Sequence, residues 1–364
     1  MRRLAMRLFP PTIAGLVKFP GSFLLVCLLM TSPISCVDHS QFSRLSPLPD
    51  REGFAGAFAG VADGKLIVAG GANFPDKKPW EGGKKVWYDT VFALEEPGGQ
   101  WRTIGKLPRP LGYGISVTTK EGVVCLGGSD AEKHHAEVLQ LAIKGGQVET
   151  KSLPSLPIPL ANGSGALVGG TVFVFGGSDH PGEQSALNHL FALDLSSPQL
   201  QWKELEPCPG KARILPVAAA LEGAFYIAGG AALEATDGKV ARVYLLDAWR
   251  YQPGHGWQRI ADLPKPSVAA PSPAPVLDAR IFIVGGDDGS LVGFQPIEKH
   301  PGFPKSILTY DARKNVWSVD GAVPASRATL PTAFWQGRWI LPSGEARPGV
   351  RSPEVWTFAP AAQH

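Results

Sequence analysis

Residues 66–71 read Leu-Ile-Val-Ala-Gly-Gly, and the same arrangement, an apolar strand ending in two glycines, recurs four more times along the chain. The other copies are Val123–Gly128, Val172–Gly177, Ala224–Gly230 and Arg280–Gly286. Successive glycine pairs lie 49 to 57 residues apart, which is the period of a four-stranded kelch-type blade with loops of variable length. The repeat therefore predicts an all-β fold, a β-propeller, in which each copy is the second strand of a blade.

A sixth copy departs from the rule. Residues Arg338–Gly344 read R-W-I-L-P-S-G, and Glu345 follows directly. Counting this copy gives six blades. The glutamate is unusual because small side chains follow the glycine pair in four of the other copies. They are Ala72, Ser129, Ser178 and Ala231.

Each copy is followed by a polar loop, a third strand and, in most units, a fourth strand that opens with tryptophan. We interpret these tryptophans as wedges between neighbouring sheets, because large rings fill the space between blades. The expected third strands include Val91–Leu94, Leu190–Leu193, Val243–Leu246 and Ile307–Tyr310. The tryptophans are Trp101, Trp202, Trp257 and Trp317.

The two ends of the chain are expected to complete one blade. Val355–Phe358 has the pattern of a third strand with no successor, and Phe42–Pro49 has that of a fourth strand with no predecessor. Pairing between them closes the ring and removes two exposed strand edges. We therefore predict a single domain over residues 37–364, a six-bladed kelch-type propeller closed by its terminal strands.

The first 36 residues have the features of an export signal. The leader begins with a basic region that contains Arg2, Arg3, Arg7 and Lys18. A short apolar segment, Phe19–Met30, comes next, and small residues follow it. The apolar segment is too short for a comfortable bilayer span. We expect removal of this leader and no transmembrane segment in the mature chain.

Cys36 leaves two processing outcomes open. It follows Ile34 and Ser35 as in bacterial lipoprotein signals, but Pro33 stands where such signals usually have an aliphatic residue. We favour ordinary cleavage near this point, with a lipid anchor at Cys36 as the alternative.

The charge balance of the mature chain favours no polyanionic partner. Four of the 35 basic residues, and none of the 32 acidic residues, lie in the leader, so the remainder is nearly neutral. It gives no electrostatic basis for binding nucleic acid or an anionic membrane. Of the four cysteines, Cys125 and Cys208 lie in the mature part, and we expect two buried free thiols there.

Two stretches of the chain carry a family resemblance. Gly53–Leu94 contains F-A-G-A-F-A-G, I-V-A-G-G-A-N-F-P and W-E-G-G-K-K, and Ser343–Arg351 reads S-G-E-A-R-P-G-V-R. These stretches resemble the kelch-propeller N-acetylneuraminate epimerases, or sialic acid mutarotases, which are exported to the bacterial periplasm. Their order is the reverse of that in the better-known form, so the chain resembles a cyclically permuted branch of the family.

The resemblance implies an isomerase that interconverts the α and β anomers of N-acetylneuraminate, or a related acidic sugar, without a cofactor. Glu345 and Arg351 are the implied catalytic pair: the glutamate transfers a proton, and the arginine holds the substrate carboxylate or stabilises developing negative charge. On pattern alone, a structural ion pair within a loop is the favoured interpretation of these two residues.

Six further residues are predicted to bind substrate, because their loops should emerge on the face that carries Glu345. The first long loop also contains Lys85, and for Trp80 stacking on a sugar and packing within the loop stay open. The six residues are Asn73, Trp80, Glu81, Lys84, Arg213 and Arg327. His134-His135 and Asp179-His180 lack spaced partners, so no metal site is predicted.

A second class of function stays open, a non-catalytic propeller that binds a glycan or a protein through the same face. A carboxylate and a guanidinium converging in one pocket would favour the enzyme. Two other propeller enzymes are excluded, since the chain shows neither the cysteine–tyrosine setting of copper-radical oxidases nor the Asp-box repeats of sialidases.

Overall fold

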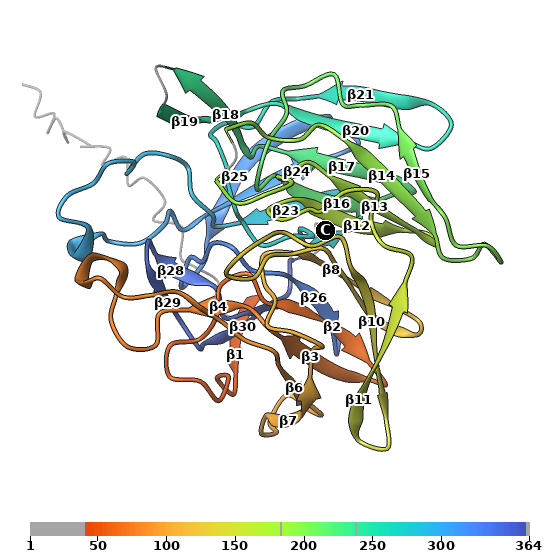
Figure 1. The fold of residues 1–364 in the computed structure, drawn as a ribbon. Helices are drawn as coiled ribbons and strands as arrows, with labels where there is room; N and C mark the ends of the chain where they lie inside the picture. The colour runs from red at the N-terminus through yellow and green to blue at the C-terminus, as the bar shows by residue number, and fades with distance from the viewer. Residues whose placement is uncertain (1–40, 183, 237–238, 362–364) are drawn as a thin grey trace, which may run out of the picture. The chain divides into compact units, whose positions relative to one another are not determined.

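The computed structural model describes residues 41–182, 184–236 and 239–361. These residues form six four-stranded antiparallel sheets arranged as a six-bladed β-propeller (Figure 1). The innermost strands of neighbouring sheets contact one another around the axis. The predicted fold class is thus confirmed, whereas the predicted leader and Cys36 lie outside the described residues.

The strands of each blade are given from the axis outward. Blade I contains β2 (Phe58–Ala62), β3 (Lys65–Ala69), β6 (Thr90–Leu94) and β7 (Arg102–Lys106). Blade II contains β8 (Ile115–Thr119), β9 (Gly122–Leu126), β10 (Val138–Lys144) and β11 (Gln147–Leu153). Blade III contains β12 (Ser164–Val168), β13 (Thr171–Phe175), β14 (Leu190–Asp194) and β15 (Trp202–Leu205).

The second half of the chain repeats this order. Blade IV contains β16 (Val217–Leu221), β17 (Ala224–Ala228), β20 (Ala248–Gln252) and β21 (Gly256–Ile260). Blade V contains β22 (Val276–Leu277), β23 (Arg280–Val284), β24 (Ser306–Asp311) and β25 (Val316–Ala322). Blade VI contains β26 (Ala333–Trp335), β27 (Arg338–Pro342), β30 (Val355–Phe358) and β1 (Phe42–Leu45).

Three hairpins extend the loops between second and third strands. They are β4 (Ala72–Asn73) with β5 (Val86–Trp87), β18 (Ala231–Thr236) with β19 (Lys239–Tyr244), and β28 (Glu345–Arg347) with β29 (Val350–Arg351). Two short 3-10 helices lie in the same class of loop, η2 (Pro79–Glu81) and η3 (Ile297–Lys299). Across the described ranges, no helix has the length and apolar character to cross a bilayer.

One predicted strand was misplaced. Val243–Leu246 was expected to be the third strand of its blade, but the third strand of blade IV is β20, at Ala248–Gln252. Val243 instead belongs to β19 of the inserted hairpin, and the N–H of Leu245 donates to the carbonyl of Gly230. The apolar residues do form a strand, but this strand belongs to an inserted hairpin that precedes the third strand of the blade.

The terminal strands close the ring as predicted. Strand β1 pairs with β30 in antiparallel register, with Phe42 opposite Phe358. The two phenyl rings stack with centroids 4.8 Å apart, and both side chains are buried. The edge of blade VI is therefore covered by a strand from the other end of the chain.

The tryptophans that open the fourth strands join neighbouring blades. Trp101 donates its indole N–H to the carbonyl of Ser46 in blade VI at 2.7 Å, and Trp202 donates to Pro154 in blade II at 2.8 Å. Trp257 and Trp317 make the equivalent bonds to Glu206 and Ala261. Each ring thus fills the space between two sheets and satisfies its only polar group there, which confirms a structural role.

The glycine pairs end the second strands where neighbouring blades come closest. Gly70 has a φ of 63°, and a Cβ at this position would lie 2.3 Å from the carbonyl oxygen of Leu111, at the entry to the next blade. The N–H of Gly71 donates to that same carbonyl. Glycine is required because the close approach leaves no room for a side chain.

A closed ring of six backbone hydrogen bonds surrounds the propeller axis. One residue from the entry to each blade donates its N–H to the carbonyl of the equivalent residue in the blade before it, at 2.7–3.0 Å. All six have φ between 52° and 64°, although only one is glycine. The members of this axial ring are Gly56, Tyr113, Asn162, Leu215, Ala269 and Thr329.

Gly56→Ala should destabilise the propeller through the axial ring. Gly56 has a φ of 64°, and a Cβ there would lie 2.7 Å from both Cδ1 and N of Tyr113. Gly64 is a matched control, because it has a φ of 71° but nothing within 4 Å. Gly64→Ala should cost about 1–2 kcal/mol of unfolding free energy, from backbone strain alone. Gly56→Ala should cost about 1–3 kcal/mol more, from overpacking. Equal losses in urea unfolding would contradict the steric argument.

Candidate active site

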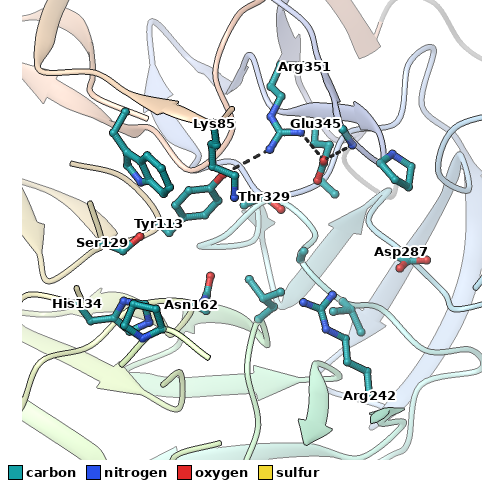
Figure 2. A pocket seen from close by; sticks show the side chains of 18 of the residues that line it. Lys85, Tyr113, Ser129, His134, Asn162, Arg242, Asp287, Thr329, Glu345 and Arg351 are labelled. Carbon is teal, nitrogen blue, oxygen red and sulfur yellow. Dashed lines mark hydrogen bonds and ion pairs between the residues drawn. The ribbon is translucent and has the colours of Figure 1, made fainter. Parts of the chain in front are cut away.

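A pocket of about 530 Å³ lies over the axis on the face where the loops between second and third strands emerge. Its volume is in the range of small-molecule sites. The five members of the axial ring that carry side chains all line it, and loops from all six blades form its walls (Figure 2). The propeller therefore brings residues far apart in sequence to one cavity.

Glu345 and Arg351 meet at this pocket, as the sequence predicted. They face each other across the hairpin of β28 and β29, and Arg351 Nη1 lies 2.5 Å from Glu345 Oε1. The same oxygen accepts the N–H of Gly349 at 2.8 Å. The side chain of Arg351 is 5% exposed and that of Glu345 19%, so the pair is largely shielded from bulk water.

The residues of the sixth copy explain why this hairpin can form. Ser343 takes the place of the first glycine with a φ of 63°, and its hydroxyl accepts the N–H of Phe54 and donates to the carbonyl of Ser352. Gly344 keeps the bend with a φ of 93°. The departure from Gly-Gly thus supplies two side-chain hydrogen bonds, one of which joins Ser343 to Ser352 on the far side of the Glu345–Arg351 segment.

Arg351 is held by three groups of the protein. Beyond its contact with Glu345, its Nη2 lies 3.4 Å from the hydroxyl of Tyr113, and its guanidinium lies 4.9 Å from the ring centroid of Phe74. Both terminal nitrogens are therefore engaged by side chains of this chain. This arrangement favours Arg351 as a group that positions Glu345 over one that grips a ligand carboxylate by both nitrogens.

Two other cations line the pocket. Lys85 Nζ lies 5.0 Å from the ring centroid of Tyr113 and 5.3 Å from that of Trp87, while Arg242 projects from β19 (Figure 2). Neither side chain forms an ion pair with any described residue. Blades I and IV are opposite in a six-bladed ring, so these two charges stand on opposite walls.

The two aspartates of the pocket are already bonded to protein groups. Burial opposes ionisation of Asp130, but N–H groups of Lys133 and Glu132 and the ring of His135 outweigh it and lower the pKa of Asp130 to about 2. Asp287 accepts the hydroxyl proton of Tyr244 at 2.6 Å. Burial and this bond raise the pKa of Tyr244 well above its usual value. Both carboxylates therefore act as acceptors at the wall.

Four predicted binding residues of the first loop lie outside the pocket. Asn73 is fully buried: its amide donates to Asp50 and Gly53 and accepts the hydroxyl of Tyr88, so it ties loops together. Glu81, at the end of η2, accepts the N–H of Lys78, and Lys84 is exposed. Trp80 packs against Gly349, in the turn that holds Glu345. The four residues are Asn73, Trp80, Glu81 and Lys84.

Arg213 and Arg327, also predicted to bind substrate, point away from the pocket. Each lies two residues before a member of the axial ring; Arg213 is buried there and Arg327 is half-buried. Arg213 is fully buried and binds both carboxylate oxygens of Asp247, at 3.0 and 2.6 Å. Arg327 binds Glu354 at 2.6 Å. In both cases the axial-ring residue two positions later, Leu215 or Thr329, turns its side chain to the pocket instead.

Sequence reasoning missed Tyr113, Asn162, Trp87 and Arg242, all of which line the pocket. A signal for two of them was present. Tyr113 and Asn162 are large polar residues between small ones, in Gly-Tyr-Gly and Ala-Asn-Gly at the entry to a first strand. No motif marks Arg242. In the part of the chain that the structure describes, no group of three or more His, Cys, Asp or Glu side chains is placed to hold a metal ion.

The chain matches the family model described as N-acetylneuraminate epimerase over residues 38–150 and 153–295. A protein of that name from Haemophilus influenzae (strain PittEE) is 29% identical over 230 residues, covering 56% of this chain and 58% of the relative. One from Salmonella enteritidis PT4 is 42% identical over 102 residues, covering 25% and 26%. The chain thus spans little more than half the length of the curated relatives it matches, and the matched family range ends before Glu345. The cyclic permutation stays a prediction.

Asp247→Asn should show that Arg213 has a structural role. It leaves a fully buried guanidinium without its carboxylate, which should cost about 3–5 kcal/mol of unfolding free energy. Asp262→Asn is the control, because its pair with Arg259 is exposed and should be worth less than about 1 kcal/mol.

The destabilisation caused by Asp247→Asn should depend on pH, and the pKa of Asp247 determines the direction. Arg213 is the main group that lowers the folded-state pKa of Asp247 against the opposing effect of burial. The stabilisation is therefore present above the unfolded-state pKa of Asp, about 3.9, and is lost as pH falls through the folded-state value. Chemical unfolding at pH 7 and in acid measures both effects, and equal costs for the two variants would contradict the assignment.

Proposed function

The chain belongs to the N-acetylneuraminate epimerase family, and we propose that it interconverts the α and β anomers of N-acetylneuraminate or a closely related acidic sugar. The observation that carries this proposal is the Glu345–Arg351 pair at the pocket over the propeller axis. We further propose that the protein acts after export, on the strength of the basic and apolar leader in residues 1–36.

Anomer exchange in such a sugar is a problem of proton transfer. The anomeric carbon, C2, is a hemiketal that carries a carboxylate, and its configuration inverts only if the ring opens to a ketone and closes again. Opening requires that one group take the proton of the anomeric hydroxyl while another protonates the ring oxygen. This reaction requires neither a redox cofactor nor a Lewis acid.

Glu345 is the group that takes the anomeric proton. Its Oε1 is occupied by Arg351 and by the N–H of Gly349. Its Oε2 accepts no hydrogen bond from the described residues, and the side chain lines the pocket. Arg351 and the turn thus hold the carboxylate by one oxygen and leave the other for the substrate, which is the preorganisation that proton transfer needs.

Lys85 is the partner for the substrate carboxylate. It has no ion pair within the described ranges, and its ammonium lies over the ring of Tyr113, whose hydroxyl contacts Arg351. The carboxylate is attached to the reacting carbon itself, so its cation must lie near Glu345. Lys85, from the neighbouring blade, meets that condition, whereas Arg242 stands across the pocket and would contact the remote hydroxyl groups.

Glu345→Gln should abolish most of the acceleration of mutarotation. Proton NMR of freshly released α-N-acetylneuraminate should show a faster approach to the β anomer with the wild-type protein than in buffer. The variant should be slower than wild type by about 100-fold or more, because a positioned proton-transfer group contributes 10²–10⁴ in rate. Thermal unfolding of the variant serves as the control for folding.

Two results would overturn these assignments. A wild-type rate equal to that of the buffer would remove the proposed reaction and favour a propeller that only binds a glycan. A fully active Glu345→Gln variant would remove the role of Glu345 alone.

Lys85→Gln should raise KM for the acidic sugar, and Lys84→Gln should not. The two lysines are adjacent, but only Lys85 lines the pocket, so Lys84 is a control of the same chemistry. A hydrogen bond to a charged group is worth about 1.5–3 kcal/mol, which corresponds to a rise in KM of about tenfold or more. Equal KM values for the two variants would show that Lys85 does not bind the carboxylate.

A further inference from the structure

We propose that Tyr113 is the second proton-transfer group, the acid that protonates the ring oxygen of the sugar. The inference rests on the proposed function and names a residue for the half of the reaction that Glu345 cannot perform. It derives from how Tyr113 is placed relative to Arg351 and the pocket (Figure 2).

The hydroxyl of Tyr113 and the carboxylate of Glu345 flank the same guanidinium. Arg351 Nη1 donates to Glu345 Oε1 at 2.5 Å, and Nη2 donates to the Tyr113 hydroxyl oxygen at 3.4 Å. The proton acceptor and the hydroxyl are therefore held side by side, each by one nitrogen of a planar group. The anomeric hydroxyl and the ring oxygen of the sugar are likewise neighbours, because both are bonded to C2.

The direction of the Tyr113 proton follows from the chemistry of arginine. A guanidinium has donors only, so the tyrosine oxygen must accept in that contact, and its own O–H points elsewhere. No described residue accepts that proton. Because Tyr113 lines the pocket, the O–H is available to a ligand there.

The axial ring fixes Tyr113 more firmly than an ordinary loop residue. Its N–H donates to Gly56 and its carbonyl accepts the N–H of Asn162, with a φ of 61°. Its aromatic ring meets the edge of Trp87, with centroids 6.4 Å apart. The side chain is thus held in place before any ligand binds, so little reorganisation is needed during proton transfer.

Three other ionisable groups of the pocket, two aspartates and Lys85, suit this role less well. The carboxylates of Asp130 and Asp287 are already engaged as acceptors, by the ring of His135 and by the hydroxyl of Tyr244. Lys85 has protons, but they serve the substrate carboxylate in the proposed scheme. Lys85 and Arg351 are also the two cations nearest Tyr113, and they offset the negative charge that its oxygen develops.

Ring opening moves one proton to Glu345 and one proton from Tyr113. Glu345 takes the proton of the anomeric hydroxyl, the O–H electron pair becomes the C2 carbonyl π bond, and the bond from C2 to the ring oxygen breaks. The ring oxygen keeps that electron pair and takes the proton of Tyr113, which leaves a phenolate. After rotation about the bond next to C2, the phenolate takes the proton back as the freed hydroxyl attacks the other carbonyl face. Glu345 then returns its proton to the carbonyl oxygen, and the enzyme is regenerated.

Tyr113→Phe tests the role, because it removes only the hydroxyl and leaves the backbone ring and the aromatic packing intact. We expect kcat for mutarotation by NMR to fall about 10²–10⁴-fold. The Kd for N-acetylneuraminate, measured by isothermal titration calorimetry, should stay within about threefold of wild type. Tyr310→Phe is the matched control, because Tyr310 lies in blade V outside the pocket and its hydroxyl donates to Asn315; this variant should keep kcat within about threefold of wild type.

A second measurement separates proton transfer from support of Arg351. Replacement of Tyr113 by fluorinated tyrosines makes the hydroxyl more acidic while its size changes little. The high-pH limb of kcat should move to lower pH as fluorines are added, whereas a hydroxyl that only supports Arg351 would leave the profile unmoved.

The outcomes distinguish this inference from the proposed function. An active wild type with an equally active Tyr113→Phe variant, or a pH profile that does not move, overturns the role of Tyr113 alone. A wild type that does not accelerate mutarotation overturns the proposed function, and this inference with it.

Discussion

Six backbone hydrogen bonds around the axis determine both the closure of the propeller and the floor of its pocket. Each participating residue adopts a left-handed conformation, which costs a residue other than glycine about 1–2 kcal/mol. Five of the six accept that strain, and the same five side chains line the pocket. Five of the eleven described non-glycine residues with positive φ therefore lie where the blades meet and where a ligand would bind.

The axial ring also gives a simple rule for which side chains face the pocket. A ring residue turns its side chain to the cavity, and the residue two positions earlier turns its side chain between the blades. Tyr113 obeys the first half of the rule and Arg213 the second. A scaffold with approximate sixfold repetition thus becomes an asymmetric site, because six unlike residues occupy the ring.

Much of the fold was predictable because it repeats. The Gly-Gly copies located the second strands, the unpaired terminal strands predicted the closure of blade VI, and the odd sixth copy predicted Glu345 and Arg351 at one pocket. The rest depends on features that do not repeat. The hairpin of β18 and β19 displaced the third strand of blade IV and carries Arg242, and an apolar run such as Val243–Leu246 does not distinguish an inserted strand from a blade strand.

The charges of the pocket restrict which acidic sugars the proposed mechanism accepts. Arg351 is already paired with Glu345, so a ligand carboxylate has Lys85 and Arg242 as its cations, and these stand on opposite walls. A carboxylate at Lys85 brings the carbon that bears it close to Glu345. In some other acidic sugars the carboxylate is remote from the anomeric carbon. When the carboxylate of such a sugar binds Lys85, its anomeric carbon lies away from Glu345. The position of a single lysine thus favours sugars in which the acid and the hemiketal share one carbon.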